Sequence, residues 1–250
     1  MKISYFITLL FTCLPFLGFV TRGNFLTLQN LDLPIILASL RVSFVSSLIS
    51  IFIVVLMGLP AGYYMAKAQF KGKKMLDNLF SLPQFLPPAV VGLLLLLTYG
   101  NHGFLGRYLT AFGIRISFSM TAVVLTFIFV ALPIFIKGVS VAFAEVDPKL
   151  EQTAQLLGDS PLQVFLRISF PLARKGILVA LIMAASRGIS EFGATMMFAG
   201  NLSGVTQTLP LAIYTALESN LNNALFLAFI MFIMSLGMLT LVHVLGKDRD

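Results

Sequence analysis

Charged residues are scarce in this sequence. Only 11% of its 250 residues are Asp, Glu, Lys or Arg, and 58% are hydrophobic, which gives a mean hydropathy of +0.96. A soluble domain carries about 25% charged residues. The polar surface is too small to cover a water-soluble globule, so we expect lipid around most of the chain.

Cysteine, histidine and catalytic motifs are also nearly absent. Cys13 is the single cysteine, which excludes a disulfide or a thiolate-ligated metal site within one chain. His102 and His243 are predicted on opposite sides of the membrane. No G-x-x-x-x-G-K-[ST] phosphate loop occurs, and Glu191 is the only acidic residue deep in an apolar segment. We therefore expect no catalytic, cofactor or metal site, and no enzyme activity of the chain's own.

Long apolar segments account for most of the chain. Each is near or above the ~17–25 residues that cross a bilayer as a helix. They cover residues 4–20, 35–66, 79–99, 118–136, 176–199 and 224–245. The sequence therefore predicts an all-α polytopic membrane protein with about six transmembrane helices, forming one transmembrane domain over residues 1–250.

The first segment also has the form of a signal peptide, because Lys2 precedes its apolar run. Small residues of the A-x-A kind are missing before a cleavage point. Thr12 precedes Cys13, which makes a poor lipoprotein site. We therefore expect a retained helix.

Lysine and arginine set the predicted orientation, because cytoplasmic loops carry an excess of them. With the N-terminus inside, twelve fall on the cytoplasmic side: Lys2, Lys67, Lys71, Lys73, Lys74, Lys137, Lys149, Arg167, Arg174, Lys175, Lys247 and Arg249. Three fall outside: Arg22, Arg107 and Arg115. This asymmetry predicts cytoplasmic N- and C-termini. It also explains the net charge of +7 without a nucleic-acid partner.

A polar segment at about 147–170 follows the fourth apolar segment, on the predicted cytoplasmic side. Asp147 is a good N-cap and Pro148 suits the first helical position. Gly158 is placed to end this first helix in the left-handed conformation. The apolar stripe of the helix is Leu150, Ala154 and Leu157.

A second short helix is predicted directly afterwards. Ser160 is its cap, Pro161 its first residue, and Gln163 completes a capping box. Its apolar face is Leu162, Phe165 and Leu166. Pro171 is expected to open the next span. Two caps and a glycine turn predict a rigid hairpin that docks onto a soluble partner, and the alternative is a loop that merely lies on the membrane.

The hairpin resembles the cytoplasmic loop of ABC-importer permeases, whose pattern is Glu-Ala-Ala, three residues, Gly, nine residues, Ile, one residue, Leu-Pro. Gly158, Ile168 and Pro171 fall at that spacing. Gln152-Thr153-Ala154 stands in place of Glu-Ala-Ala, with Glu151 one place earlier, and Phe170 replaces the leucine. The departure at Gln152 puts a specific ion pair there in doubt. The resemblance implies that ATPase coupling rests on Asp147, Glu151, Gln152, Thr153, Ala154, Leu157, Gly158, Ser160, Pro161 and Phe165.

Two further stretches are similar to the molybdate branch of these permeases. They are "LPPAVVGLLLLLTYGNHGFLGRYL" at 86–109 and "SRGISEFGATMMFAGNLSGVTQTLPLAIYTALES" at 186–219. Sulfate permeases share the Glu-Phe-Gly and Gly-Asn elements. The resemblance implies a type I importer fold, a homodimer of this subunit and two ATPase subunits that hold ATP and Mg²⁺. It also implies an extracytoplasmic binding protein that delivers molybdate or tungstate across the cytoplasmic membrane of a prokaryote.

Two charges lie inside the fifth apolar segment. Arg187 and Glu191 are four residues apart and can pair on one helix face, which we expect Thr195 to continue. One interpretation is a buried pair that fixes helix packing. The other is a pathway or gate where Arg187 helps an oxyanion to cross.

Other polar features have two interpretations each. Arg41 is expected to extend to the interface. The stripe Ser43, Ser46, Ser47 and Ser50 is expected to serve packing rather than a pathway. Pro87-Pro88 should break the third span, either lining a cavity or only distorting the packing.

The segment at 206–219 is expected outside as a short amphipathic element, either re-entrant or interfacial. The candidate contacts with the binding protein are Gln207 and Tyr214 in this segment and Asn201 just before it.

The resemblance implies that the chain is a permease subunit of an ATP-driven molybdate importer, with a sulfate importer as the alternative. An oxyanion channel and an intramembrane enzyme are more distant possibilities. A channel would not need the capped hairpin.

Overall fold

The computed structural model describes residues 2–22 and 31–246, and that part of the chain is built from helices without strands. The helices are α1 (Lys2–Arg22), α2 (Leu33–Lys67), α3 (Lys73–Phe85), α4 (Pro88–Tyr99), α5 (Gly106–Ala111), α6 (Met120–Ala144), α7 (Pro148–Leu156), α8 (Pro161–Val164), the π-helical turn η1 (Phe165–Ser169), α9 (Phe170–Ile189), α10 (Gly193–Phe198), α11 (Leu209–Ser219) and α12 (Leu221–Gly246). Within the described residues, five helices are long and apolar enough to cross a membrane, and the bent pair α3–α4 makes a sixth candidate. The all-α fold with about six spans is confirmed.

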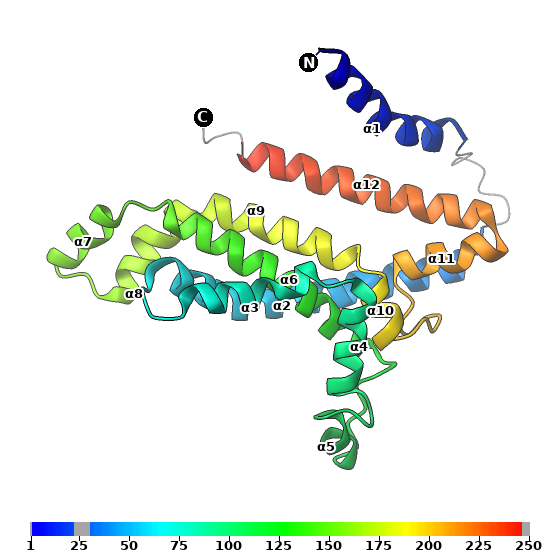
Figure 1. Cartoon of the computed structure of the whole chain (residues 1–250), viewed down its shortest axis with the longest axis horizontal. Helices are drawn as coiled ribbons and strands as arrows, with labels where there is room; N and C mark the ends of the chain where they lie inside the picture. Colours follow the sequence, from blue (N-terminus) through cyan, green and yellow to red (C-terminus); the bar gives the residue numbers. More distant parts are fainter. Residues whose placement is uncertain (1, 23–30, 247–250) are drawn as a thin grey trace.

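Helix α6 is the centre of the bundle, and α2 and α9 pack along it (Figure 1). Glycines let the helices approach closely. A Cβ on Gly62 would lie 2.5 Å from Val139 Cγ1, and one on Gly138 would lie 2.5 Å from Ala180 Cβ. The core between the three helices includes the fully buried Phe135 and Phe143. Small residues at helix contacts are typical of membrane bundles.

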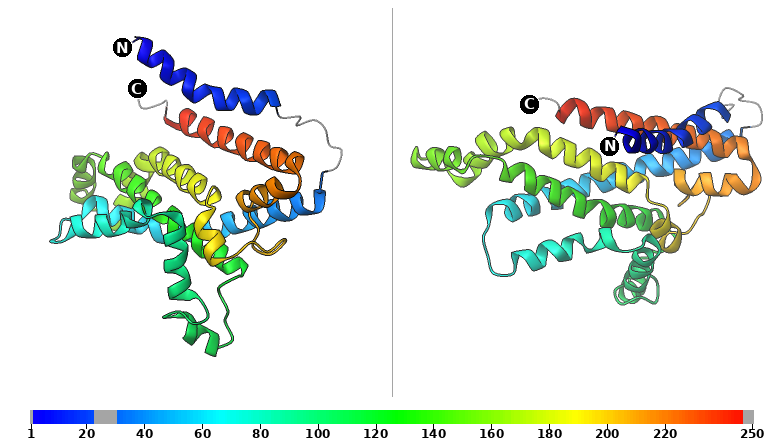
Figure 2. Two further views of the ribbon diagram at one scale, coloured as in Figure 1. Left: turned by 45° about the vertical axis from the view of Figure 1, so that its right-hand side comes forward. Right: turned by 45° about the horizontal axis from the view of Figure 1, so that its top comes forward.

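Two smaller cores flank this centre. One joins α4, α6 and α10 around Phe127 and Phe198. The other joins α2, α11 and α12 around Leu209 and Leu227. The hairpin α7–α8 lies at one end of the bundle and α11 at the other (Figures 1 and 2).

The third span is not one helix. α3 ends at Phe85, α4 begins at Pro88, and the two are bent by 110° relative to each other. The break predicted at Pro87-Pro88 is therefore confirmed, because proline has no amide hydrogen to donate and its ring blocks a continuing helix. α4 and α5 consequently project sideways from the bundle (Figure 2).

The fifth span was predicted as one continuous helix over 176–199, and this prediction is wrong. α9 stops at Ile189, and α10 starts anew at Gly193. Glu191 lies in this break rather than within a helix. Hydropathy detects that a segment is apolar, but it does not report such an interruption.

Serines of α2 face the interior. Ser43, Ser46, Ser47 and Ser50 are all buried. Ser50 donates to the carbonyl of Val124 in α6, and Ser43 accepts from the amide of Leu209 at 2.8 Å. These contacts support the packing interpretation of the stripe. Arg41 is exposed in the N-terminal part of α2, as expected for a side chain that extends to the interface.

The N-terminal segment is helical, and the rings of Phe16 and Phe19 in α1 contact Phe232 of α12. Cys13 is exposed. The predicted topology also used Lys2, Arg22, Lys247 and Arg249, whose side chains lie outside what the structure describes.

Candidate coupling site and transmembrane pathway

The first helix of the hairpin forms as its caps predict. Asp147 Oδ1 accepts from the amide of Lys149 at 2.9 Å, and Pro148 is the first helical residue. At the other end Gly158 has φ +99°. The amides of Gly158 and Asp159 donate to the carbonyls of Gln155 and Ala154. This is a Schellman motif, which needs a residue that tolerates the left-handed conformation.

The second helix begins with the predicted capping box. Ser160 Oγ accepts from the amide of Gln163, and Gln163 Oε1 accepts from the amide of Ser160 at 2.7 Å. Pro161 occupies the first helical position. The two reciprocal bonds satisfy amides that would otherwise lack a partner at a helix start. The turn between the two helices is therefore fixed at both sides.

Pro171 does not open a new span, contrary to the prediction. α8 passes through η1 directly into α9, so that Pro161–Ile189 is one helical segment of 29 residues. Pro171 is accommodated in the first turn of α9, where proline's missing donor is tolerated best. The second arm of the hairpin is thus one end of a candidate membrane helix, the end that the lysine and arginine count predicts to be cytoplasmic.

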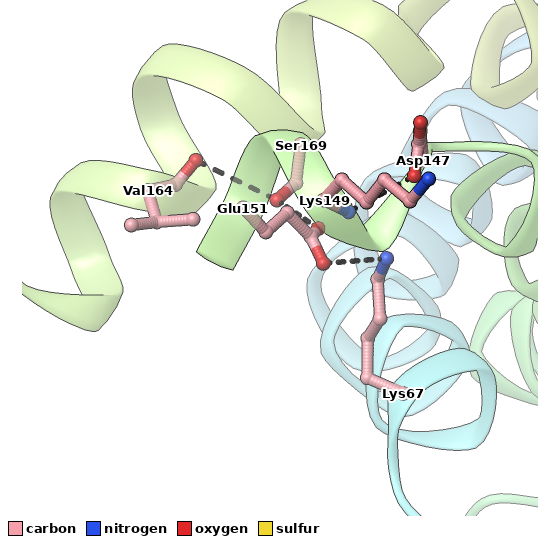
Figure 3. A network of polar contacts seen from close by, with 6 residues as sticks. All are labelled: Lys67, Asp147, Lys149, Glu151, Val164 and Ser169. Carbon is pink, nitrogen blue, oxygen red and sulfur yellow. Dashed lines mark hydrogen bonds and ion pairs between the residues drawn. The ribbon is translucent and has the colours of Figure 1, made fainter. Parts of the chain in front are cut away.

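Glu151 connects three elements (Figure 3). Its Oε2 lies 2.8 Å from Nζ of Lys67, the last residue of α2. Its Oε1 accepts from the hydroxyl of Ser169, in η1, at 2.6 Å. The side chain of Glu151 is only 12% exposed and that of Lys67 24%. Gln152 has no carboxylate, so an ion pair at that position was in doubt. The neighbouring Glu151 forms one instead, and its partner Lys67 belongs to the same chain.

The predicted coupling residues divide into two groups. Gln152, Thr153 and Leu157 are exposed, and the neighbouring Leu156 is 88% exposed. Ala154 is buried instead, against the second arm of the hairpin. Phe165 faces inward, with its ring 5.0 Å from that of Tyr63 in α2 and 5.8 Å from that of Phe143 in α6. The apolar tip formed by Leu156 and Leu157 is the surface free to meet a partner.

Arg187 and Glu191 form the predicted ion pair, with Nη1 and Oε2 2.6 Å apart. The other carboxylate oxygen of Glu191 accepts from the amide of Ala194, in the first turn of α10, at 2.9 Å. Glu191 is 1% exposed. Its carboxylate therefore holds α9 and α10 together across the break.

Arg187 also lines a cleft of about 360 Å³ between α9 and α12. Serine side chains also line this cleft: Ser186 on α9, Ser190 directly after α9, and Ser235 on α12. Thr195 does not continue the Arg187 face, because it belongs to α10. It is fully buried, and its hydroxyl has no hydrogen-bond partner among the described residues.

Helix α11 begins inside the bundle. It starts at Leu209, whose amide donates to Ser43, ten residues and about 15 Å along α2 from the N-terminal end of that helix. It ends at Ser219, close to the point where Asn223 Oδ1 accepts from the amide of Asp32. The chain therefore enters the bundle before α11 and returns along α11 to the N-terminal end of α2, which is the course expected of a re-entrant element.

The three outer candidates do not form one surface. Asn201 and Gln207 both donate to the hydroxyl of Thr215 in α11. Gln207 is only 4% exposed, so it cannot face a docked protein, and it lines a cavity of about 610 Å³ between α2, α11 and α12. Tyr214 is 44% exposed, with its ring 5.5 Å from that of Phe192.

Lys67 and Tyr63 were not recognised from the sequence as parts of the hairpin site, and Ser169 lies within the predicted hairpin without its contact to Glu151 having been predicted. Lys67 and Glu151 are 84 positions apart, and local spacing says nothing of contacts over that distance. Within residues 2–22 and 31–246, no group of three or more His, Cys, Asp or Glu side chains is arranged to hold a metal ion.

Comparison with known proteins supplies the family. The model of the binding-protein-dependent transport system inner membrane component matches residues 58–247. This chain belongs to that family. It is a multi-pass protein of the inner membrane, and its relatives are transport permeases rather than enzymes.

Two relatives with different named cargoes align with the same share of this chain, so their identities can be compared directly. The chain is 39% identical over 206 residues to the putative molybdenum transport system permease protein YvgM of Bacillus subtilis, covering 82% of this chain and 90% of the relative. It is 31% identical over 205 residues to the sulfate transport system permease protein CysW of Synechocystis, covering 82% of this chain and 74% of the relative.

Solved structures share the fold. A bacterial ABC transporter involved in the import of the acidic polysaccharide alginate aligns with a TM-score of 0.70 at 16% identity, covering 100% of this chain and 93% of the other. A bacterial alginate ABC transporter in complex with a pentasaccharide-bound periplasmic protein aligns with a TM-score of 0.66 at 18% identity, covering 99% and 91%. The family's importer-permease fold is therefore the fold of this chain.

Proposed function

We propose that this chain is the permease subunit of an ATP-driven importer that moves molybdate, and also tungstate, into the cell by alternating access. The observation that carries the proposal is the construction of the hairpin. Its exposed apolar tip is held by a Schellman motif and a capping box, and its second arm runs without a break into α9. A partner that displaces the tip therefore displaces a membrane helix.

Two ATPase subunits are the partners that this proposal requires. They bind ATP with Mg²⁺, and each receives the tip of one hairpin. An extracytoplasmic binding protein delivers the oxyanion to the α11 end, and two copies of the permease enclose the pathway. The cycle needs the ATPase to bind the inward- and outward-facing states with different affinity, because a ligand without that difference shifts no equilibrium.

Molybdate is favoured over sulfate by the comparison of the two relatives. Over the same share of this chain, identity to the molybdenum permease is 39% and to the sulfate permease 31%. Both anions are tetrahedral dianions, so the permease sees similar charge and shape. We place selection and tight binding in the delivery protein, since a permease must release its cargo.

Arg187, Glu191 and Thr195 remain the candidates for the pathway. Thr195 is fully buried, and its hydroxyl has no hydrogen-bond partner among the described residues, a feature that it shares with Ser47 and Thr208. Arg187 and Glu191 are better suited to the structural role. Their charges offset each other, and Glu191 is bonded to both sides of the helix break.

The test is reconstitution of the permease with its ATPase and binding protein in proteoliposomes. Radiolabelled molybdate uptake and ATP hydrolysis are measured on the same sample. A Leu157→Cys variant, made in a Cys13→Ser background, is labelled with a reagent that carries a thiol-reactive arm and a photoreactive arm, and the assembled complex is illuminated. We expect ATP-dependent uptake and a crosslink between the tip and the ATPase subunit.

The outcomes separate the alternatives. Uptake of sulfate in preference to molybdate through the same binding protein would assign the chain to the sulfate branch. Uptake without ATP would make it a channel. A hairpin that never crosslinks to the ATPase would contradict the coupling role.

A further inference from the structure

The carboxylate of Glu151 is turned toward the bundle, unlike the polar side chains beside it in the hairpin. Gln152 and Thr153, its neighbours in the chain, are exposed, whereas Glu151 is turned toward the bundle and is 12% exposed. Both of its oxygens are occupied, one by Lys67 and one by Ser169 (Figure 3). Each oxygen of Glu151 therefore already has a partner within this chain.

The two groups that hold Glu151 belong to different membrane helices. Lys67 ends α2, which packs along α6 through Gly58 and Gly62. Ser169 ends η1, which continues directly as α9. α7 itself contacts mainly α8 and η1. The ion pair with Lys67 joins α7 to α2, and the bond from Ser169 joins α7 to the start of α9.

The π-helical turn supports this arrangement. Its wider turn, closed by the bond from the Phe170 amide to the Phe165 carbonyl, buries Ser169 completely beside α7. Such single π-turns are often found at functional positions within helices. The hydroxyl proton of Ser169 goes to the carboxylate at 2.6 Å rather than to the Val164 carbonyl at 3.5 Å.

We propose that Glu151 is a positioning residue that ties the docking hairpin to α2 and α9 together, so that a displacement of the tip reaches both membrane helices at once. This proposal rests on the proposed coupling to an ATPase. It differs from a docking role, because the contacts of Glu151 lie within this chain. Without Glu151, a force on Leu156 and Leu157 would still reach α9 through α8, but α7 would lose its ion pair with α2, and the contact of Phe165 with Tyr63 would be left to link the hairpin to that helix.

The charge arrangement permits a sharp test by exchange of the two partners. In Lys67→Glu/Glu151→Lys the ion pair is kept with its polarity reversed. The Ser169 hydroxyl can accept from a lysine amine as well as it donates to a carboxylate. A role inside the chain should therefore survive the exchange, whereas a contact with a foreign protein should not.

The experiment uses the complete transporter in proteoliposomes, and the readout is molybdate taken up per ATP hydrolysed. The amount of ATPase that co-purifies with the permease is measured beside it. Glu151→Gln and Lys67→Gln should each lower uptake per ATP by about two- to thirtyfold, the range for changes along a coupling route, with unchanged co-purification. Lys67→Glu/Glu151→Lys should recover most of the wild-type ratio.

Asp77→Asn is the matched control. Asp77 forms another ion pair on the same side, with Lys137 at 2.6 Å between α3 and α6, and the two side chains are 37% and 54% exposed. Its loss should leave uptake per ATP unchanged. Ser169→Ala removes one of the two contacts of Glu151 without changing charge, and it should give a smaller loss than Glu151→Gln. Ser169→Ala also tests the proposal if the charge variants do not assemble with the ATPase.

Two results would overturn the proposal. One is a wild-type ratio in both Glu151→Gln and Ser169→Ala. The other is loss of ATPase co-purification in Glu151→Gln that the charge exchange does not restore, which would mean a direct contact. Failure of the coupling role itself would show separately. In that case Leu157→Cys, with Glu151 and Lys67 unchanged, would not crosslink to the ATPase.

Discussion

At the scale of single residues, local spacing was enough to predict a contact when both partners lie within one helical turn. Arg187 and Glu191 pair as their separation of four predicts. Their surroundings were not predictable in the same way. Glu191 is buried at a helix break and also bonds Ala194, and a break depends on packing against α4 and α6 rather than on neighbours in sequence.

Neutralising Glu191 should destabilise the protein. Glu191→Gln keeps an acceptor for the Ala194 amide but leaves the Arg187 guanidinium without its counter-charge. Breaking a buried pair costs about 3–5 kcal/mol, and we expect the lower end because the Arg187 side chain is 36% exposed. The measurement is thermal unfolding of the detergent-solubilised permease.

The double variant Arg187→Gln/Glu191→Gln distinguishes the two roles. If the pair is structural, the double variant should unfold at a higher temperature than Glu191→Gln, because no unpaired charge remains, and it should retain uptake. Full stability combined with lost uptake would instead place Arg187 on the path of the anion.

At the scale of elements, the two helix breaks lie against each other. A Cβ on Gly193, the first residue of α10, would come 2.8 Å from Cβ of Pro88, the first residue of α4. A Cβ on Gly92 would meet the carbonyl oxygen of Ala194 at 2.7 Å. α4 and α10 therefore pack backbone to backbone, where neither can yield by a side-chain rotation.

Gly92→Ala should separate α4 from α10. Its added methyl meets backbone atoms and Met197 Cβ at 2.6 Å, and overpacking of this kind costs about 1–3 kcal/mol. Gly237→Ala in α12 is the matched control, since nothing lies within 4 Å of its Cβ and alanine favours a helix by up to about 1 kcal/mol. Thermal unfolding should shift down for the first and not for the second. Equal shifts would contradict the close packing.

The turn of the hairpin makes a prediction of a different kind, because it concerns backbone conformation and not space. Nothing lies within 4 Å of a Cβ at Gly158, but its φ is +99°. Gly158→Val should strain the turn by about 1–2 kcal/mol and lower uptake per ATP, whereas Gly158→Asn, which tolerates left-handed φ, should do so much less. If valine and asparagine behave alike, rigidity of the turn is not needed for coupling.

At the scale of the whole molecule, composition predicted the class of fold, and hydropathy predicted the number of spans. The caps predicted the hairpin at 147–170 almost residue by residue, since Asp147, Gly158 and Ser160 act through their own neighbours. Three tertiary features could not be predicted from the sequence. They are the direction that α4 takes after the 110° bend, the ion pair between Glu151 and Lys67, and the position inside the bundle at which α11 begins. Each depends on residues that are distant in the chain.

The orientation of the molecule is testable with thiol labelling, again in the Cys13→Ser background. The hairpin and α11 lie at opposite ends of the bundle (Figure 1), and the excess of lysine and arginine predicts that the hairpin end is cytoplasmic. Leu157→Cys and Ser203→Cys are both at exposed positions. A membrane-impermeant maleimide added to intact spheroplasts should label Ser203→Cys and leave Leu157→Cys unlabelled until the membrane is opened. The reverse pattern would put the hairpin outside, out of reach of any cytoplasmic ATPase, and the importer assignment would then be wrong. Labelling of both positions in intact spheroplasts would show that the cells had leaked, which a cytoplasmic marker enzyme measured in the same sample detects.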